Sequence, residues 1–327
     1  MQSLEDYFSG EFWSAQGWMA PWLKQAPPAY WREMTLAIVA SLKRKDRDQY
    51  VLTDAGRFFL RNQLCLRLSQ ASDAFVPWLE QAVPLKGARI LEFGCGTGSS
   101  TAGLAHAGAN VRGIDIQGKS LQLARKRLPL LGYEATFTEA AADWLSKPLD
   151  ADDFRGPFDL IVCYAMLEHL LVPERLHLLS LCRDIMARDG AILAVFETPN
   201  RFAPFDWHSS KLSFLDILPD ELAFEYARRN SARGDHPARR HGSVENDYQQ
   251  LYRFGRGVSW HEFDIAIGMG SLEVLLDGYS PKSLGQKSYH PEPAFEDALA
   301  DIFARLEPPV PKGFCRPSLE LLLKLKA

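Results

Sequence analysis

Short apolar runs and amphipathic stretches alternate along the chain from residue 89 to residue 196. The runs have the length and composition of buried strands, and the stretches between them have the spacing of helices. The predicted strands cover residues 89–93, 111–116, 135–138, 158–164 and 191–196. The predicted helices cover residues 99–107, 119–130 and 174–186. Alternation of this kind predicts a parallel sheet covered by helices.

Two further strands are expected near the end of the chain. Residues 258–267 alternate between apolar and polar side chains, and residues 317–326 form a nearly continuous apolar run. Together these elements predict an α/β fold with a doubly wound, mostly parallel, seven-stranded sheet of the Rossmann-like kind. In a strand over residues 258–267, alternation would direct His261 and Glu262 to opposite faces, so at most one of them could reach a pocket.

Two stretches fall outside this alternation. Residues 1–85 are expected to form a helical N-terminal segment, and residues 86–327 a second domain that carries an insertion at 197–257. The N-terminal segment is rich in aromatic residues, namely Tyr7, Phe8, Phe12, Trp13, Trp18, Trp22, Tyr30 and Trp31. These side chains are expected to cap the core or to form a homodimer contact; the alternative is a lid over a substrate pocket. An insertion as long as the second stretch, at the ligand edge of a sheet, is more often functional than accidental.

Composition narrows the class of protein. The chain of 327 residues is 46% hydrophobic and 24% charged, as in ordinary globular proteins, and its formal net charge is −4. A net negative charge argues against a nucleic-acid partner. The five cysteines form no CxxC pair, which favours reduced thiols over disulfides or a zinc cluster. No signal peptide or membrane-spanning run is evident, so a cytoplasmic protein without a membrane span is expected.

The glycine-rich stretch that follows the first predicted strand indicates a nucleotide-type cofactor loop. Glycines stand at positions 94, 96 and 98, and a helix of small residues is expected to start at Ser99. Glycines permit positive φ angles and close approach of a ligand, and a helix start offers unpaired N–H groups. A dinucleotide fingerprint requires GxGxxG or GxGxxA, whereas this chain has Ser99 at the third small position. The spacing is therefore GxGxG.

Three motifs together resemble the class I S-adenosylmethionine-dependent methyltransferases. They are Ile-Leu-Glu-Phe-Gly-Cys-Gly-Thr-Gly, Gly-Ile-Asp-Ile and Phe-Asp-Leu-Ile-Val-Cys-Tyr-Ala-Met-Leu-Glu-His-Leu. The resemblance extends from about residue 85 to residue 200 and returns in the closing strands. It implies that the cofactor is S-adenosyl-L-methionine.

The resemblance also implies which residues bind that cofactor. The backbone of residues 94–98 would lie against its methionyl part and ribose, and Asp115 would accept hydrogen bonds from the ribose hydroxyls. The turn at 141–143 would border the adenine, although the family often has an Asp where this chain has Ala. The full predicted set is Glu92, Gly94, Cys95, Gly96, Gly98, Asp115, Ile116, Ala142, Asp143 and Tyr164.

Glu168 and His169, just past the fourth strand, are candidates for the chemistry. The Leu-Glu-His ending resembles the ubiquinone-biosynthesis O-methyltransferases and the terminal-nucleotide RNA 2′-O-methyltransferases. Those families hold a divalent cation with a further Glu three residues earlier, where this chain has Ala165. Three roles for His169 remain open: a residue that orders its loop, a general base, or a metal ligand.

His208 is the second candidate. It lies in Glu197-Thr-Pro-Asn-Arg-Phe-Ala-Pro-Phe-Asp-Trp-His, after the fifth strand. If that loop is extended, Asp206 and His208 face the same direction. Together with Glu168 and His169 they could form a cluster suited to a divalent ion or to acid–base work. The alternative is that His208 caps local structure.

The insertion also carries a basic cluster, which consists of Arg228, Arg229, Arg233, Arg239 and Arg240. It is either a solvated face or a site for an anionic acceptor.

The sequence as a whole predicts methyl transfer to an oxygen of a small metabolite, a sugar or a lipid-linked intermediate. Transfer to an RNA terminus or to nitrogen is the alternative within the same fold. A catalytically inactive cofactor-binding scaffold is the alternative outside enzymes.

Overall fold

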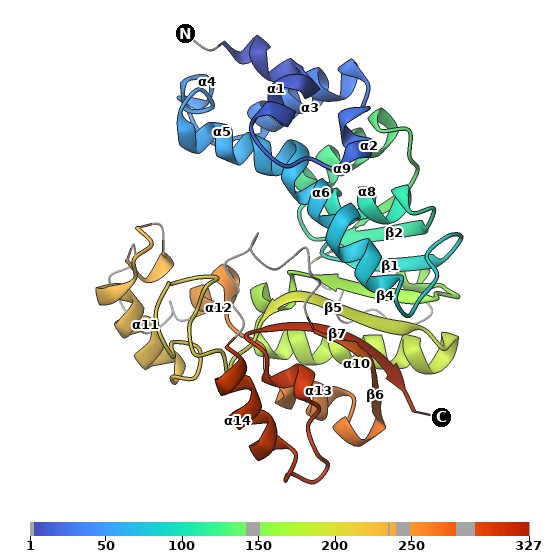
Figure 1. The fold of residues 1–327 in the computed structure, drawn as a ribbon, viewed down its shortest axis with the longest axis vertical. Coiled ribbons are helices and arrows are strands. Elements are labelled where there is room, and N and C mark those ends of the chain that lie inside the picture. The colour runs from blue at the N-terminus through green and yellow to red at the C-terminus, as the bar shows by residue number, and fades with distance from the viewer. Residues whose placement is uncertain (1–2, 142–150, 235, 240–248, 279–291, 327) are drawn as a thin grey trace. The chain divides into compact units, whose positions relative to one another are not determined.

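The computed structural model describes residues 3–141, 151–234, 236–239, 249–278 and 292–326. Seven strands form one sheet in the order β3-β2-β1-β4-β5-β7-β6 (Figure 1). The pairs β1–β2, β2–β3 and β4–β5 are parallel, whereas β7 runs antiparallel to β5 and to β6. The predicted seven-stranded, mostly parallel sheet is therefore confirmed. The chain divides into two compact units, Met1–Trp144 and Leu145–Ala327, which are described in turn.

The sheet strands of the first unit follow the predicted pattern. They are β1 (Arg89–Phe93), β2 (Asn110–Asp115) and β3 (Thr136–Glu139). Helix α8 (Ser99–His106) follows β1, and helix α9 (Gly118–Leu130) follows β2. Gly98 precedes α8 with a φ of 75°, and a Cβ there would lie 2.9 Å from the Cβ of Ala124. Only glycine therefore allows α9 to pack so closely beside the start of α8.

Residues before β1 form helices around an aromatic core. The elements are η1 (Leu4–Phe8), α1 (Gly10–Ala15), α2 (Pro21–Lys24), α3 (Pro28–Ser41), α4 (Arg47–Tyr50), α5 (Asp54–Arg61), η2 (Asn62–Leu66), α6 (Arg67–Gln70), η3 (Ala71–Phe75) and α7 (Val76–Leu79). Tyr7, Trp13, Tyr30 and Trp31 are all buried. The Trp13 indole donates to the Tyr7 carbonyl over 2.9 Å, and the Tyr30 hydroxyl donates to the Leu64 carbonyl over 2.6 Å. These four aromatic residues are thus core residues of this unit, with their polar atoms satisfied.

In the second unit, strands pack against one long helix. The strands are β4 (Leu160–Tyr164), β5 (Ile192–Pro199), β6 (Leu272–Asp277) and β7 (Ser318–Leu325). Helix α10 (Val172–Asp189) lies against β5 and β7, and Gly190 ends it in the left-handed conformation. Helix α14 (Pro293–Phe303) precedes β7. The unit also contains the short 3₁₀ turns η5 (Asp152–Phe154), η6 (Leu167–His169), η8 (Met269–Ser271) and η9 (Lys312–Cys315).

The predicted strand over residues 258–267 is wrong. Residues Trp260–Ala266 form helix α13, and the strand of this region is β6, which starts at Leu272. Ser259 and Glu262 form a capping box, because the Glu262 carboxylate accepts the Ser259 amide over 2.8 Å. The motif Ser-x-x-Glu outweighs the apparent alternation. His261 and Glu262 therefore lie on a helix, and the expectation that they point to opposite faces of a strand is wrong as well.

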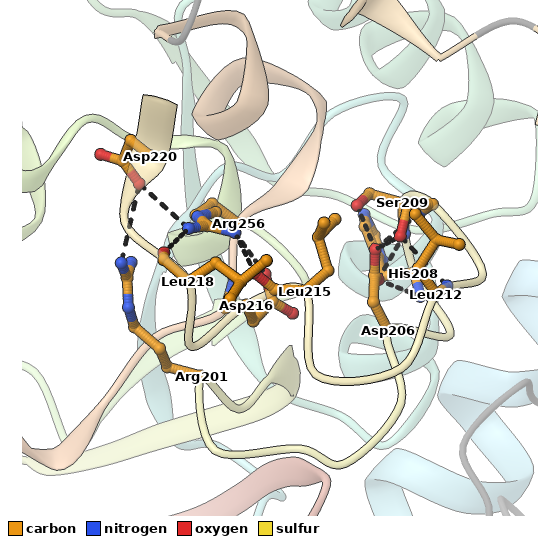
Figure 2. Close-up of polar contacts among 12 residues, drawn as sticks. Arg201, Asp206, His208, Ser209, Leu212, Leu215, Asp216, Leu218, Asp220 and Arg256 are labelled. Carbon is orange, nitrogen blue, oxygen red and sulfur yellow. Dashed lines mark hydrogen bonds and ion pairs between the residues drawn. The ribbon is translucent and has the colours of Figure 1, made fainter. Parts of the chain in front are cut away.

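The stretch after β5 forms a small folded region of its own. It contains α11 (Asp220–Asn230), η7 (Pro237–Arg239) and α12 (Gln249–Gly255). Its buried apolar residues are Leu215, Ala223, Phe224, Ala227, Ala238 and Leu251. Arg256 is 1% exposed and donates to the carbonyls of Leu215 and Leu218, as Figure 2 shows. This arginine therefore joins the end of α12 to the loop that precedes α11.

Among the described helices, none has both the length and the apolar character that a membrane crossing requires.

Candidate functional site

The glycine loop has the backbone that the sequence predicts. Gly94, Gly96 and Gly98 take φ angles of 70°, 53° and 75°. Asp115 lies at the end of β2, and its carboxylate accepts the Gly96 amide over 2.7 Å and the Gln117 amide over 2.8 Å. A carboxylate has about four acceptor positions, so Asp115 can take further donors while it holds the loop. The next residue, Ile116, leaves 56% of its surface exposed beside this carboxylate.

Glu92 and Cys95 shape the loop from within. Glu92 is fully buried and accepts the hydroxyls of Ser100 and Thr101, which ties the end of β1 to the first turn of α8. Burial raises the pKa of Glu92, and these two hydroxyl groups oppose that shift. Cys95 is 3% exposed, and its Sγ would lie 2.7 Å from a Cβ at Gly113. Burial raises the pKa of the Cys95 thiol, so it remains protonated.

Two predicted cofactor residues, Ala142 and Asp143, lie outside the described residues.

Two residues, one directly after β4 and one inside β5, have strained backbone. Ala165 has a φ of 48° and Glu197 a φ of 57°, although neither is glycine. The Tyr164 hydroxyl donates to Glu197 over 2.6 Å, and the Ala165 amide donates to the Phe196 carbonyl over 2.8 Å. Strain of this kind gathers at active sites and ligand clamps. The sequence identifies Tyr164 as a candidate but gives no sign that Glu197 is its partner.

The structure brings Glu168, His169 and His208 together. Each offers one ligand atom, and these three atoms all lie within 4.8 Å of one another. Glu168 and His169 belong to η6, just after β4, whereas His208 comes from the insertion after β5. The imidazole rings of the two histidines have centroids 5.4 Å apart.

Glu168 is an unusual carboxylate. Its side chain is 0% exposed, and neither of its oxygens has a hydrogen-bond partner among the described residues. The Nε2 atom of His169 lies 3.7 Å from Oε1 of Glu168. Removing an ionised carboxylate from water costs several kcal/mol unless a cation or donors compensate it. The cluster therefore favours a positive charge beside Glu168, either the imidazolium ion that forms when a histidine takes up a proton or a bound cation.

Each histidine has a ring nitrogen close to the Glu168 carboxylate. The Nδ1 atom of His169 lies 3.2 Å from the carbonyl oxygen of Arg253. Because a carbonyl only accepts, Nδ1 is the donor, and in the neutral imidazole Nε2 therefore carries the lone pair. Burial lowers the pKa of His208, and the nearby Glu168 opposes that shift. His208 is therefore neutral at pH 7 and able to accept a proton or bind a metal.

Asp206 does not join the cluster, contrary to the extended-loop expectation. The residues after it form a turn, in which Asp206 accepts the backbone amides of His208, Ser209 and Ser210 over 2.9, 2.7 and 2.6 Å (Figure 2). Its oxygens satisfy local donors, as Asp commonly does in turns. His208 is placed by this turn and not by alternation.

The described arginines of the insertion mostly pair locally. Arg228 and Arg229 bind Glu225 at 2.6 and 3.5 Å on the exposed face of α11. Arg233 donates to the His208 carbonyl over 2.9 Å, so it supports the backbone of the candidate site. Arg240 lies outside the described residues.

Residues from the two histidine segments form a suitable set for a divalent cation. One carboxylate oxygen and two imidazole nitrogens suit Zn²⁺ or Mn²⁺ better than Mg²⁺, which prefers an all-oxygen shell. A backbone carbonyl on the far nitrogen of His169 is the outer support that metal-binding histidines usually have. The buried, unpartnered Glu168 would gain its missing partner.

Comparison with known proteins gives the family. A protein-family model described as "Methyltransferase domain" matches residues 90–190. The ubiquinone biosynthesis O-methyltransferase of Aromatoleum aromaticum is 31% identical over 204 residues, which cover 62% of this chain and 73% of that protein. The enzyme of the same name from Dechloromonas aromatica is 33% identical over 117 residues, 36% of this chain and 47% of that protein. The chain thus spans about half the length of one of these relatives and about three quarters of the other.

Solved structures are also similar in part. Magnesium protoporphyrin IX methyltransferase from Synechocystis, with bound SAH, is 27% identical; the match covers 44% of this chain and 61% of that one, with a TM-score of 0.34. PKMT2 from Rickettsia typhi, in complex with AdoHcy, is 15% identical; the match covers 79% of this chain and 52% of that one, with a TM-score of 0.43.

Proposed function

The chain belongs to the class I S-adenosylmethionine-dependent methyltransferases, and from that premise we propose that it methylates a hydroxyl oxygen of a small molecule at the Glu168/His169/His208 cluster. The buried Glu168 carboxylate beside the basic Nε2 of His169 carries this proposal. A hydroxyl acceptor must lose its proton during transfer, and this pair can take the proton and stabilise the resulting charge. The similarity to enzymes named O-methyltransferases supports oxygen over nitrogen.

In the proposed reaction, the acceptor oxygen forms a bond to the methyl carbon while the bond from that carbon to the sulfonium sulfur breaks. The sulfur keeps the electron pair and leaves as a neutral thioether, so positioning and proton removal are the main tasks of the protein. His169 Nε2 receives the hydroxyl proton, and Glu168 stabilises the imidazolium ion. His208, neutral because of its burial, orients the hydroxyl or relays its proton.

The same three residues would also hold a divalent cation, with the carboxylate of Glu168 and one nitrogen from each histidine. Such a cation, when bound, supplies Lewis acidity that lowers the pKa of a coordinated hydroxyl.

We assign the methyl donor to the glycine loop and Asp115, and the selection of the acceptor to the insertion at 197–257, because His208 comes from it. That residues 1–85 act as a lid or as a homodimer contact stays a prediction. A cytoplasmic location and the lack of a nucleic-acid partner also stay predictions.

Binding of S-adenosylmethionine should be weakened by a substitution in the glycine loop, and by more than the strain of placing alanine at a positive φ would explain. Gly96→Ala is expected to weaken binding at least about tenfold, because a ligand approaches the chain closely at this point. Gly87→Ala is the matched control: both glycines have positive φ, and neither would bring a Cβ closer than 4.0 Å to other atoms. Asp115→Ala should also weaken binding. Calorimetry measures all three; equal losses in the Gly96 and Gly87 variants would contradict the assignment.

Metal binding should depend on the residue that the insertion contributes. Calorimetry with Zn²⁺ or Mn²⁺ alone is expected to show one site in the wild type and at least about tenfold weaker binding in His208→Ala. His261→Ala is the control, since His261 lies outside the cluster and stacks on Trp260. No binding in the wild type, together with activity that survives a chelator, would leave acid–base chemistry as the role of the three residues.

A further inference from the structure

We infer that the segment Arg253–Gly257 is the template that orients both candidate histidines, and that Arg175 is the positioning residue that holds this template against the Glu168 loop. The segment begins near the end of α12, inside the insertion, and Arg175 lies in the first turns of α10. The inference rests on the proposed function for its catalytic meaning. Its structural part can be tested without any activity.

Arg175 joins two backbone segments through one guanidinium group. It is 0% exposed, and its Nη2 donates to the carbonyls of Glu168 over 3.1 Å and Arg256 over 2.7 Å. Its Nε donates to the Leu170 carbonyl over 3.0 Å, and its Nη1 donates to the Gly257 carbonyl over 3.1 Å.

One carboxylate accepts a hydrogen bond from this buried guanidinium group. Glu262 accepts from Nη1 of Arg175 over 3.1 Å, and Glu262 is the residue that caps α13. All five N–H groups of the guanidinium thus have acceptors. The group is planar with fixed donor directions, so four carbonyls bound to it cannot shift independently. Lysine has three donors on a flexible stem and could not hold the same four carbonyls.

The template contacts each member of the cluster in a different way. The Arg253 carbonyl accepts Nδ1 of His169, and the Arg256 amide donates to the Glu168 carbonyl over 3.0 Å. Gly255 has a φ of 123°, and a Cβ there would lie 2.2 Å from Cδ2 and 2.5 Å from Nε2 of His208. A side chain at Gly255 would therefore displace the His208 ring.

A salt bridge fixes the template from outside as well. Arg253 donates to both carboxylate oxygens of Glu174 over 2.7 Å and to the His169 carbonyl over 3.2 Å. Neighbouring residues 174 and 175 of α10 thus hold the two ends of the same segment. If these contacts weaken, the Arg253 carbonyl no longer selects the Nδ1–H tautomer of His169. The proton can then reside on Nε2, which is no longer free to accept one from the acceptor.

Nitrogen NMR of the imidazole rings tests the inference directly. The His169 signals are identified by their loss in His169→Ala. In the wild type, His169 is expected to show a single Nδ1–H tautomer. In Arg175→Lys it is expected to show a mixture, with kcat for methyl transfer lowered at least about tenfold and the affinity for S-adenosylmethionine changed less than about twofold. Arg183→Lys is the control, because Arg183 lies on the same helix and donates to a backbone carbonyl, that of Ala266.

A second variant keeps the test informative if Arg175→Lys fails to fold. Gly255→Ala leaves Arg175 unchanged and should shift the His208 ring signals and lower kcat, with S-adenosylmethionine binding retained. A wild-type tautomer and wild-type kcat in Arg175→Lys, or unchanged His208 signals in Gly255→Ala, would overturn the inference. A disturbed tautomer in Arg175→Lys combined with full activity in His169→Ala would instead overturn the proposed function and leave the positioning intact.

Discussion

Replacing His169 by alanine is expected to lower kcat for methyl transfer by about 10²–10⁴-fold, the usual contribution of a positioned general base. The affinity for S-adenosylmethionine should change less than about twofold, because the residues assigned to the methyl donor belong to the loop after β1 and to Asp115. Steady-state kinetics with a panel of hydroxylated acceptors and calorimetry with the cofactor separate the two effects. A loss in kcat without a loss in cofactor affinity is the signature of a residue that acts on the acceptor.

Glu168→Gln tests the charge beside this histidine with little change in volume. In the proposed reaction, the buried carboxylate stabilises the imidazolium that forms when His169 takes a proton, and an amide cannot do so. We expect a loss in kcat of at least about tenfold. His177→Ala is the control, since His177 is exposed on α10. Full activity in both the His169 and Glu168 variants, with an acceptor that the wild type methylates, would contradict the assignment of this cluster.

The parts of the fold and site that local patterns determine are predictable from the sequence. Strand β1 and the glycine loop are predictable because a buried apolar run followed by glycines has few alternative conformations. The same holds for Glu168 and His169, since they come directly after a strong strand pattern. The resemblance to known methyltransferases then gives the cofactor without further structural reasoning.

The parts that depend on long-range contacts are not predictable in this way. Arg175 looks like any helical surface arginine in the sequence, but its acceptors lie up to 87 residues away, at Glu262. Gly255 looks like a helix terminator, yet its close neighbour is His208. The strand predicted over 258–267 is a different kind of error. It could have been avoided, because Ser259 and Glu262 have capping-box spacing.

The charged residues buried in the insertion lead to a prediction on stability. Asp216 is 3% exposed, and burial raises its pKa from 3.8 to about 7; repulsion by Asp206 adds to this, whereas Arg256 and the Gly257 amide oppose it. Arg256 lies 3.4 Å away, and it also binds Asp220 at 3.1 Å and the carbonyls of Leu215 and Leu218 (Figure 2). Neutralising Asp216 therefore leaves Arg256 with its other partners.

The sign of the pH dependence follows from proton binding. Between pH 4 and pH 7 the folded protein holds a proton on Asp216 that the unfolded chain releases, so this group makes the free energy of unfolding fall as pH rises through that window. The loss is complete above about pH 7. Asp216→Asn cannot ionise and should be more stable than the wild type at pH 8 by about 2–4 kcal/mol, with the difference disappearing toward pH 4. Urea unfolding at both pH values measures it.

Asp220→Asn provides a contrast on the same guanidinium group. Asp220 accepts from Arg256 and from the Tyr252 hydroxyl and is more exposed than Asp216, so its substitution removes a favourable partner of a buried cation. We expect it to lower the free energy of unfolding at pH 8, where Asp216→Asn raises it. Opposite signs in neighbouring, chemically identical substitutions would show that burial of Asp216 outweighs its attraction to Arg256. A destabilised Asp216→Asn protein at pH 8 would mean instead that the ion pair with Arg256 outweighs the burial.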